Sequence, residues 1–334
     1  MVSEFEKILA RLEKEKTVGP YEHAAAELIS FVNDDSIGLV SDTFRNSKSL
    51  WVRYGVLSAY EQMNHASATS YRTLSQYCRE VILEDLLIGV ADKEERIRMQ
   101  SSDIFSNGKE LMKKVKPALG ERIVKELIAN SERVREGDVI LTLGVVDYSG
   151  ISQETKKQAV DFLVNAAIKG SSDAARGLDR IGDKDSINRV AEHWLPKLDS
   201  RKEKEVETAI NIFAEIECRA AADKVDGLVK RGFDYYNLIN VLAKSGDERH
   251  EDSIIKLMEG PSYCIVDMEI LGKKGGKKSL EILRRIVKNK KDYDKQEMEA
   301  ARDAIKEIER RMTVSSKPAE KKLEEAMRKK KVPA

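Results

Sequence analysis

The residues best suited to chemistry form one basic segment near the end of the 334-residue chain. From Lys273 to Lys291 there are nine lysine or arginine residues and a single acid, Glu281, which gives a local net charge of +8. Seven of the nine are candidate binding residues, namely Lys273, Lys274, Lys277, Lys278, Arg284, Arg285 and Lys288. Clustered cations attract acidic protein segments and nucleic-acid phosphates. The segment therefore predicts recognition of an anion, without a covalent step.

Helical spacing places most of these cations together. At 100° per residue, Lys277, Arg284 and Lys288 share one arc, whereas Leu283 and Ile286 lie opposite. The segment is therefore predicted to be a helix with one buried side and a basic ridge on the other.

Two interpretations of the ridge stay open. The Gly275–Gly276 turn before it would leave backbone N–H groups free to attract an anion. Alternatively, the ridge is a solvated face whose charge is balanced by acids of adjacent helices, such as Glu297 and Glu299. Aromatic residues for stacking bases are sparse, with only Tyr263 and Tyr293 nearby, so a nucleic acid would be held by its phosphates.

The sequence gives little support for metal binding or catalysis. The four histidines are far apart in sequence, and only His250-Glu251 forms a His-Glu dyad, which we interpret as a solvated turn. The sequence has no phosphate-binding loop, no nucleophile elbow and no Cys-x-x-Cys pair. We therefore expect no catalytic residues, no metal and no cofactor.

The elements that position the basic segment are predicted to be helices. Gly and Pro together make only 25 residues, and apolar residues recur at helical spacing, as in Ala159, Leu163 and Ala166. No long polar/apolar alternation argues for a sheet. The chain is therefore predicted to be all-α.

Internal repeats indicate how the helices are arranged. Leu178 to Ile187 matches Leu271 to Leu280, with a Leu, a Gly, a Ser and a final aliphatic residue in register, and related anchors begin at Phe213 and Leu242. These anchors are 35, 29 and 29 residues apart, a spacing typical of one helix pair per repeat. Within each unit we expect Gly to end the first helix in a left-handed conformation, and the next Asp or Ser to cap the second.

The first half contains longer units. Val52-Arg53 and Ile97-Arg98 each open a helix after a polar turn, 45 residues apart, and we expect both arginines to be structural. With these pairs and the Ile-Gly-Asp ends, the chain resembles the HEAT-like (PBS-lyase-type) helical repeat family. The resemblance implies an all-α, right-handed α-solenoid of about seven to nine helix pairs. We expect one array over residues 1–312, with divergent repeats in 1–150 and regular ones in 151–312.

The same resemblance implies a non-catalytic scaffold that binds a protein partner along a concave groove. The alternative is a nucleic-acid-binding member, possibly like the DNA-repair glycosylases of this family. Those enzymes need aromatic walls beside a carboxylate, but Trp51 and Trp194 lack the family's Trp-Asp pattern, and both are expected to be buried. The family's iron-dependent hydroxylases need several His-Glu dyads, which one dyad cannot supply.

The sequence also predicts the character of the C-terminal tail and the environment of the protein. Ser315 to Pro318 is predicted to break the last helix, and residues 313–334 to form a charged, flexible tail. No apolar run is long enough to span a membrane, and three scattered cysteines do not suggest disulfides. We expect a cytoplasmic protein, with a monomer favoured.

Overall fold

The computed structural model describes residues 3–14, 18–65, 74–113, 115–235, 237–258, 264–289 and 291–330. Throughout these ranges the regular elements are helices, and there is no strand. The chain divides into two compact units, Met1–Val190 and Ala191–Ala334, with the division inside helix α11 (Lys184–Trp194). Each unit is considered separately.

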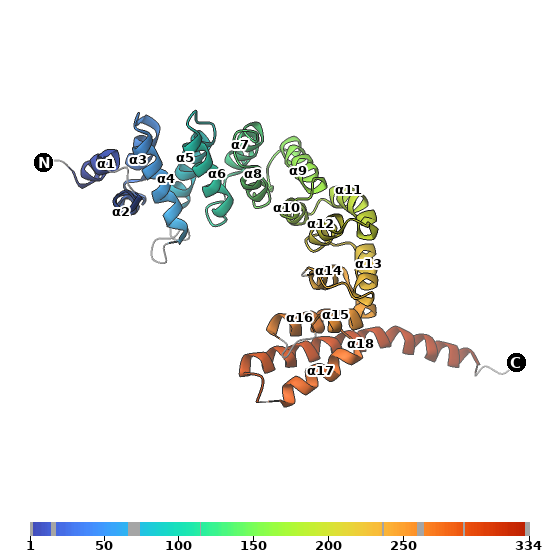
Figure 1. The fold of residues 1–334 in the computed structure, drawn as a ribbon. Helices are drawn as coiled ribbons and strands as arrows, with labels where there is room; N and C mark the ends of the chain where they lie inside the picture. Colours follow the sequence, from blue (N-terminus) through green and yellow to red (C-terminus); the bar gives the residue numbers. More distant parts are fainter. Residues whose placement is uncertain are drawn as a thin grey trace. The chain divides into compact units, whose positions relative to one another are not determined.

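The first unit consists of successive helices packed in two layers (Figure 1). Its elements are α1 (Glu4–Lys14), α2 (Val18–Leu28), the 3-10 turn η1 (Ile29–Phe31), α3 (Ile37–Asn46), α4 (Leu50–His65), α5 (Gln76–Val90), α6 (Glu95–Asn107), α7 (Pro117–Ala129), α8 (Glu136–Leu143), α9 (Gln153–Ile168) and α10 (Ser172–Ile181). Helices α3, α5, α7 and α9 pack in succession as one layer, and α4, α6, α8 and α10 as the other. Apolar side chains fill the space between the layers.

The second unit repeats this two-layer arrangement. Its elements are η2 (Leu195–Asp199), α12 (Glu203–Phe213), α13 (Arg219–Lys230), α14 (Leu238–Ser245), η3 (Glu248–His250), α15 (Glu251–Leu257), α16 (Ile265–Lys274), α17 (Lys277–Lys288) and α18 (Lys295–Lys330). Helices α12, α14, α16 and α18 stack in one layer, and α13, α15 and α17 in the other. The all-α fold of stacked helix pairs that the HEAT-like resemblance implies is therefore confirmed. The expected single array through residue 312, with its change of repeat length near residue 150, stays a prediction.

The two repeat-start arginines bind the turn between α5 and α6, in agreement with the structural role predicted for them. Arg53 forms a half-buried ion pair with Asp92 across the turn between α5 and α6. Arg98 donates to the backbone carbonyls of Asp92 and Lys93 at 2.9 and 2.8 Å. The turn that follows α5 is thus held by guanidinium groups from α4 and from α6.

Buried carboxylates form a second kind of link in the first unit. Asp85 on α5 is fully buried and accepts hydrogen bonds from Ser41 (2.8 Å), the Arg45 Nε–H (2.6 Å) and the Tyr60 hydroxyl (2.8 Å). Burial raises the pKa of Asp85 and outweighs the opposing effect of its three donors. Ser41, Tyr60 and Asp85 are buried between the layers, and the Arg45 side chain is 39% exposed, so we assign the network to folding.

The two tryptophans differ in environment. Trp194 is buried, as predicted. Trp51 is only half-buried, and the Arg96 guanidinium lies 4.9 Å from its ring centroid and 5.0 Å from that of Tyr54. The expectation that Trp51 is a core residue is therefore wrong, because its exposed side serves as a platform for the arginine.

Glycine ends the first helix of a repeat in more than one way. Gly182 has a φ of +73°, the left-handed conformation that the sequence predicted. Gly246 and Gly275 instead have extended backbones, with φ of −74° and −77°. A Cβ atom on Gly246 would lie 2.4 Å from the Leu242 carbonyl oxygen, and one on Gly275 would lie 2.1 Å from Ser279 Oγ. At these two turns glycine is needed for close approach, and the left-handed prediction is wrong.

The last helix is longer than expected. Helix α18 runs from Lys295 to Lys330 and passes through Ser315 to Pro318, where the sequence predicted a break. Flexibility of the tail stays a prediction. No helix among the described residues has the length and apolar character needed to cross a bilayer.

Candidate anion-binding pocket

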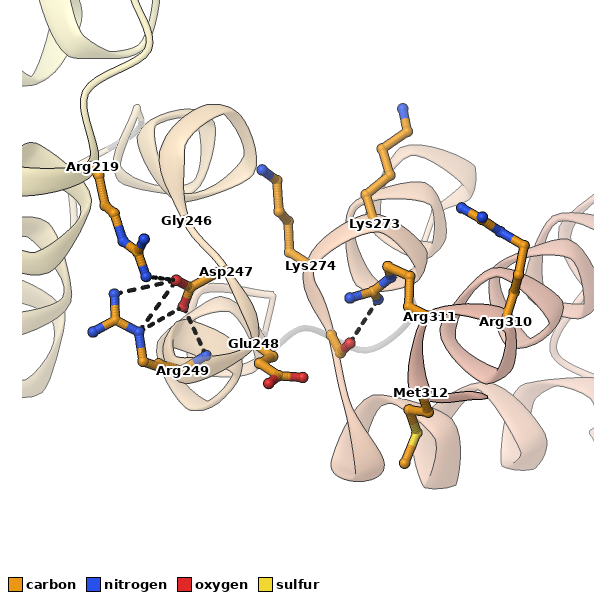
Figure 2. Close-up of a pocket in the computed structure, with 11 residues that line it drawn as sticks. Arg219, Gly246, Asp247, Glu248, Arg249, Lys273, Lys274, Arg310, Arg311 and Met312 are labelled. Atoms are coloured by element: carbon orange, nitrogen blue, oxygen red, sulfur yellow. Dashed lines mark hydrogen bonds and ion pairs between the residues drawn. The ribbon is translucent and has the colours of Figure 1, made fainter. Parts of the chain in front are cut away.

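A pocket of about 800 Å³ lies within the second unit, where the turn after α14, the end of α16 and one face of α18 meet (Figure 2). We call this candidate site the anion-binding pocket, after the basic side chains of its lining. It is lined by Arg219, Gly246, Asp247, Glu248, Arg249, Lys273, Lys274, Gly275, Arg310, Arg311 and Met312. Six of these side chains are basic and two are acidic, so the lining has a net charge of +4.

Close backbone packing brings the two helices of the pocket together. A Cβ atom on Gly272 of α16 would lie 2.9 Å from the Ala304 side chain of α18, so glycine allows the helices to approach. Arg311 of α18 then donates to the carbonyls of Gly272 and Gly275 at 2.7 and 2.8 Å. The guanidinium satisfies carbonyls at the end of α16, where a positive charge is also favoured by the helix dipole.

One wall is organised by the carboxylate of Asp247. It accepts from the Arg219 guanidinium at 2.8 Å, and from Arg249 at 3.1 Å through the side chain and 3.0 Å through the backbone N–H. Burial alone would raise the pKa of Asp247, but the hydrogen bonds from Arg249 outweigh it and hold this pKa below its ordinary value. Figure 2 shows both guanidinium groups turned toward this one carboxylate.

The opposite wall holds Lys273, Lys274 and Arg310. Lys273 is 68% exposed, and its Nζ lies 3.9 Å from the nearest carboxylate oxygen, on Glu269. Arg310 is 67% exposed and pairs with Glu307 one turn earlier on α18. Lys274 is half-buried and donates to the Lys244 carbonyl at 3.2 Å. In Figure 2 the side chains of Lys273, Lys274 and Arg310 extend to the same side of the backbone.

His250 stabilises the turn at Asp247 by a hydrogen bond. Its Nδ1 accepts the backbone N–H of Asp247 at 3.0 Å, and its Nε2 lies 3.1 Å from Asp223 Oδ1. The two ring nitrogens thus contact groups from two successive repeats, and the side chain is only 3% exposed. The prediction of a solvated turn histidine is wrong, because an aspartate from the preceding repeat completes its burial.

Glu251, the second residue of the His250-Glu251 dyad, caps the start of α17. Glu251 Oε1 accepts the backbone N–H groups of Gly276 and Ser279, at 2.6 and 2.7 Å. The prediction that the start of α17 offers free N–H groups to an anion is wrong, because a carboxylate from α15 already binds there.

The predicted basic segment is split by the fold. Only Lys273 and Lys274 line the anion-binding pocket, whereas the other five predicted residues lie on α17 outside it: Lys277, Lys278, Arg284, Arg285 and Lys288. Two of the five pair with acids of neighbouring helices, Lys278 with Asp252 at 2.7 Å and Arg284 with Glu309 at 2.8 Å. Neighbouring acids therefore balance part of the ridge, but they are not the predicted Glu297 and Glu299.

Sequence reasoning missed four of the six cations of the pocket, Arg219, Arg249, Arg310 and Arg311. They are spread over more than ninety residues and none falls in the charge-rich segment. The repeat anchors at Gly246-Asp247 and Gly275 are the signal that could have found the site, because equivalent turns of successive repeats lie on the same edge of a stacked array.

Among the residues that the structure describes, no group of three or more His, Cys, Asp or Glu side chains is placed to hold a metal ion.

Comparison with known proteins finds repeat proteins only at the level of solved structures. No protein-family model matches the chain, and no curated protein matches its sequence. An engineered protein is similar with 16% identity over 92% of this chain and 89% of its own, at a TM-score of 0.45. An archaeal HEAT-like repeats protein from Thermococcus onnurineus NA1 has 10% identity, coverage of 92% and 97%, and a TM-score of 0.29. Computationally designed armadillo repeat proteins for modular peptide recognition have 13% identity, coverage of 91% and 100%, and a TM-score of 0.20.

Proposed function

We propose that the chain is a non-catalytic helical-repeat scaffold whose second unit binds an acidic segment of a protein partner in the anion-binding pocket. The observation that carries the proposal is the excess of six basic over two acidic side chains around one recess of about 800 Å³. A recess of this size takes several side chains of an extended segment. Complementary charge would steer the partner and fix its register.

The arrangement of the cations favours binding over catalysis. Arg219 and Arg249 share Asp247, and Arg311 is held by backbone carbonyls, so these groups are fixed before a partner arrives. Lys273 is 68% exposed with its Nζ 3.9 Å from Glu269, so it can turn toward an incoming carboxylate. The exposed Arg310 would exchange its two hydrogen bonds to Glu307 for bonds to the partner. Preorganised donors together with adaptable ones suit recognition of an acidic segment.

The test is the binding of a fluorescein-labelled acidic peptide of alternating Glu and Ala, followed by fluorescence anisotropy at about 50 mM salt, where screening is weak. We expect Lys273→Gln with Arg310→Gln to weaken binding about tenfold, since two charge-assisted contacts are lost. The matched control is Arg285→Gln with Lys288→Gln, which removes the same charge from α17 outside the pocket. Equal losses in both double variants would contradict the pocket as the site, and no binding by the unmodified protein would contradict the proposed function.

A second candidate function is supported by the face of α17. Lys277, Arg285 and Lys288 are exposed there and form no ion pair with any described residue. Such a row of cations could hold a nucleic-acid backbone, with affinity that falls steeply as salt rises. Filter binding of duplex and single-stranded DNA at two salt concentrations tests this, and an absence of salt-sensitive binding at low salt would exclude it.

A further inference from the structure

The anion-binding pocket offers more donors than one carboxylate can use. Lys273 and Lys274 reach it from the end of α16, Arg310 from α18, and Arg219 and Arg249 from the facing wall. A carboxylate has one charge and two oxygens, so it engages a single guanidinium or two ammonium groups well. Donors from four separate backbone segments around one recess match a group with more charge and more oxygens.

The pocket also has one apolar wall. Met312 follows Arg310 and Arg311 in the lining, and the residue is 37% exposed. The thioether is flexible and adapts to irregular apolar partners. An apolar residue of the bound segment would therefore find a contact beside the basic groups.

We infer that the pocket is a site for a phosphorylated serine or threonine of the partner segment, with an apolar residue placed next to it on Met312. The inference rests on the proposed function and narrows its partner. A phosphomonoester has a charge of about −1.5 to −2 at neutral pH and three terminal oxygens, which suits a cluster of Arg and Lys donors.

The lining distinguishes this ligand from a nucleic acid. None of the lining residues is aromatic, so bases of a single strand would have no ring to stack on. Phosphates of a duplex would need cations in a row, whereas these cations surround one recess.

The test compares three fluorescein-labelled peptides that differ at one position, Ala-Ala-Leu-X-Ala-Ala with X as phosphoserine, glutamate or serine. We expect the phosphoserine peptide to bind about tenfold more tightly than the glutamate peptide, and the serine peptide to bind most weakly. Lys273→Gln with Arg310→Gln should reduce the advantage of phosphoserine over glutamate to about twofold. Met312→Ser should weaken both anionic peptides, and Arg285→Gln with Lys288→Gln should leave all three affinities unchanged.

The outcomes separate this inference from the proposed function. If the glutamate peptide binds as tightly as the phosphoserine peptide, the inference is overturned while acidic-segment binding stands. If none of the peptides binds, and the alternating Glu-Ala peptide does not bind either, both are overturned. If an oligothymidylate displaces the phosphoserine peptide at equal phosphate concentration, the pocket is a general phosphate-backbone site and the inference is overturned. Circular dichroism of each variant establishes that the helices are retained.

Discussion

Replacement of Asp247 by Asn should increase the affinity of the anion-binding pocket. Asp247 is the carboxylate that Arg219 and Arg249 both bind, so it competes with any incoming anion for their donors. Asn keeps the side-chain shape and caps a helix about as well as Asp. The substitution raises the net charge of the lining from the present +4 by one unit and releases two guanidinium groups.

The size of the gain follows from the exposure of the carboxylate. A unit charge about 7 Å from a bound anion contributes about 0.6 kcal/mol in water and about four times that at an effective dielectric constant of 20. The Asp247 side chain is 35% exposed, so the lower value is the better guide. We expect about 0.6 to 1 kcal/mol, which is about a three- to fivefold lower Kd.

The assay is anisotropy of the alternating Glu-Ala peptide with the unmodified protein, Asp247→Asn and a matched control, Asp252→Asn. Asp252 pairs with Lys278 at 2.7 Å and does not line the pocket, so its substitution removes the same charge from elsewhere in the unit. The difference between the variants should vanish in about 1 M salt, where the Debye length is about 3 Å. Weaker binding by Asp247→Asn, or an equal gain in Asp252→Asn, would refute the role of Asp247 as a competing anion.

Three further predictions concern the first unit and the cysteines. Asp85→Ala removes the buried acceptor shared by Ser41, Arg45 and Tyr60. Urea unfolding should show that the free energy of unfolding falls by about 2 to 4 kcal/mol. A fall below about 1 kcal/mol would show that the network is dispensable. Burial alone would raise the pKa of Asp92, but the hydrogen bond from Arg53 outweighs it and the pKa is lowered from 3.8. Ionised Asp92 therefore stabilises the fold above that value, and this stabilisation is lost as the pH falls through the lower pKa of the folded state. Between about pH 4 and 2 the Tm should fall less in Asp92→Asn than in the unmodified protein. Equal falls in the two Tm values would contradict this role of Asp92. Burial, followed by the hydrogen bond to Asp34, raises the pKa of Cys78 to about 12, whereas Cys264 is exposed. Iodoacetamide at about pH 8 should therefore label Cys264 first, and mass spectrometry that finds Cys78 labelled early in the folded protein would contradict its burial.

Features that repeat along the sequence could be predicted because each repeat imposes the same local geometry. The helical spacing of apolar residues gave the fold class, and Arg53 and Arg98 were recognised as structural from their place at the start of a helix. Gly182 follows the expected left-handed end. These predictions depend on residues within one or two turns of each other, which is the range that helix geometry controls.

The pocket could not be predicted because its residues converge through stacking. A charge count along the sequence finds Lys273 to Lys291, where the cations are close together in sequence, but the five predicted residues on α17 do not line the recess. Arg219 and Arg310 become neighbours of one pocket only when three repeats are in place. The prediction of a solvated His250 is wrong for the same reason, because its partner Asp223 lies one repeat earlier.

The most direct test of the pocket as the partner-binding site is photo-crosslinking of the alternating Glu-Ala peptide carrying one benzoylphenylalanine, with mass spectrometry of the full-length protein. We predict crosslinks on Met312 and on the turn from Gly246 to Arg249, and their loss in Lys273→Gln with Arg310→Gln. Crosslinks that map to α17 and disappear in Arg285→Gln with Lys288→Gln would contradict the account.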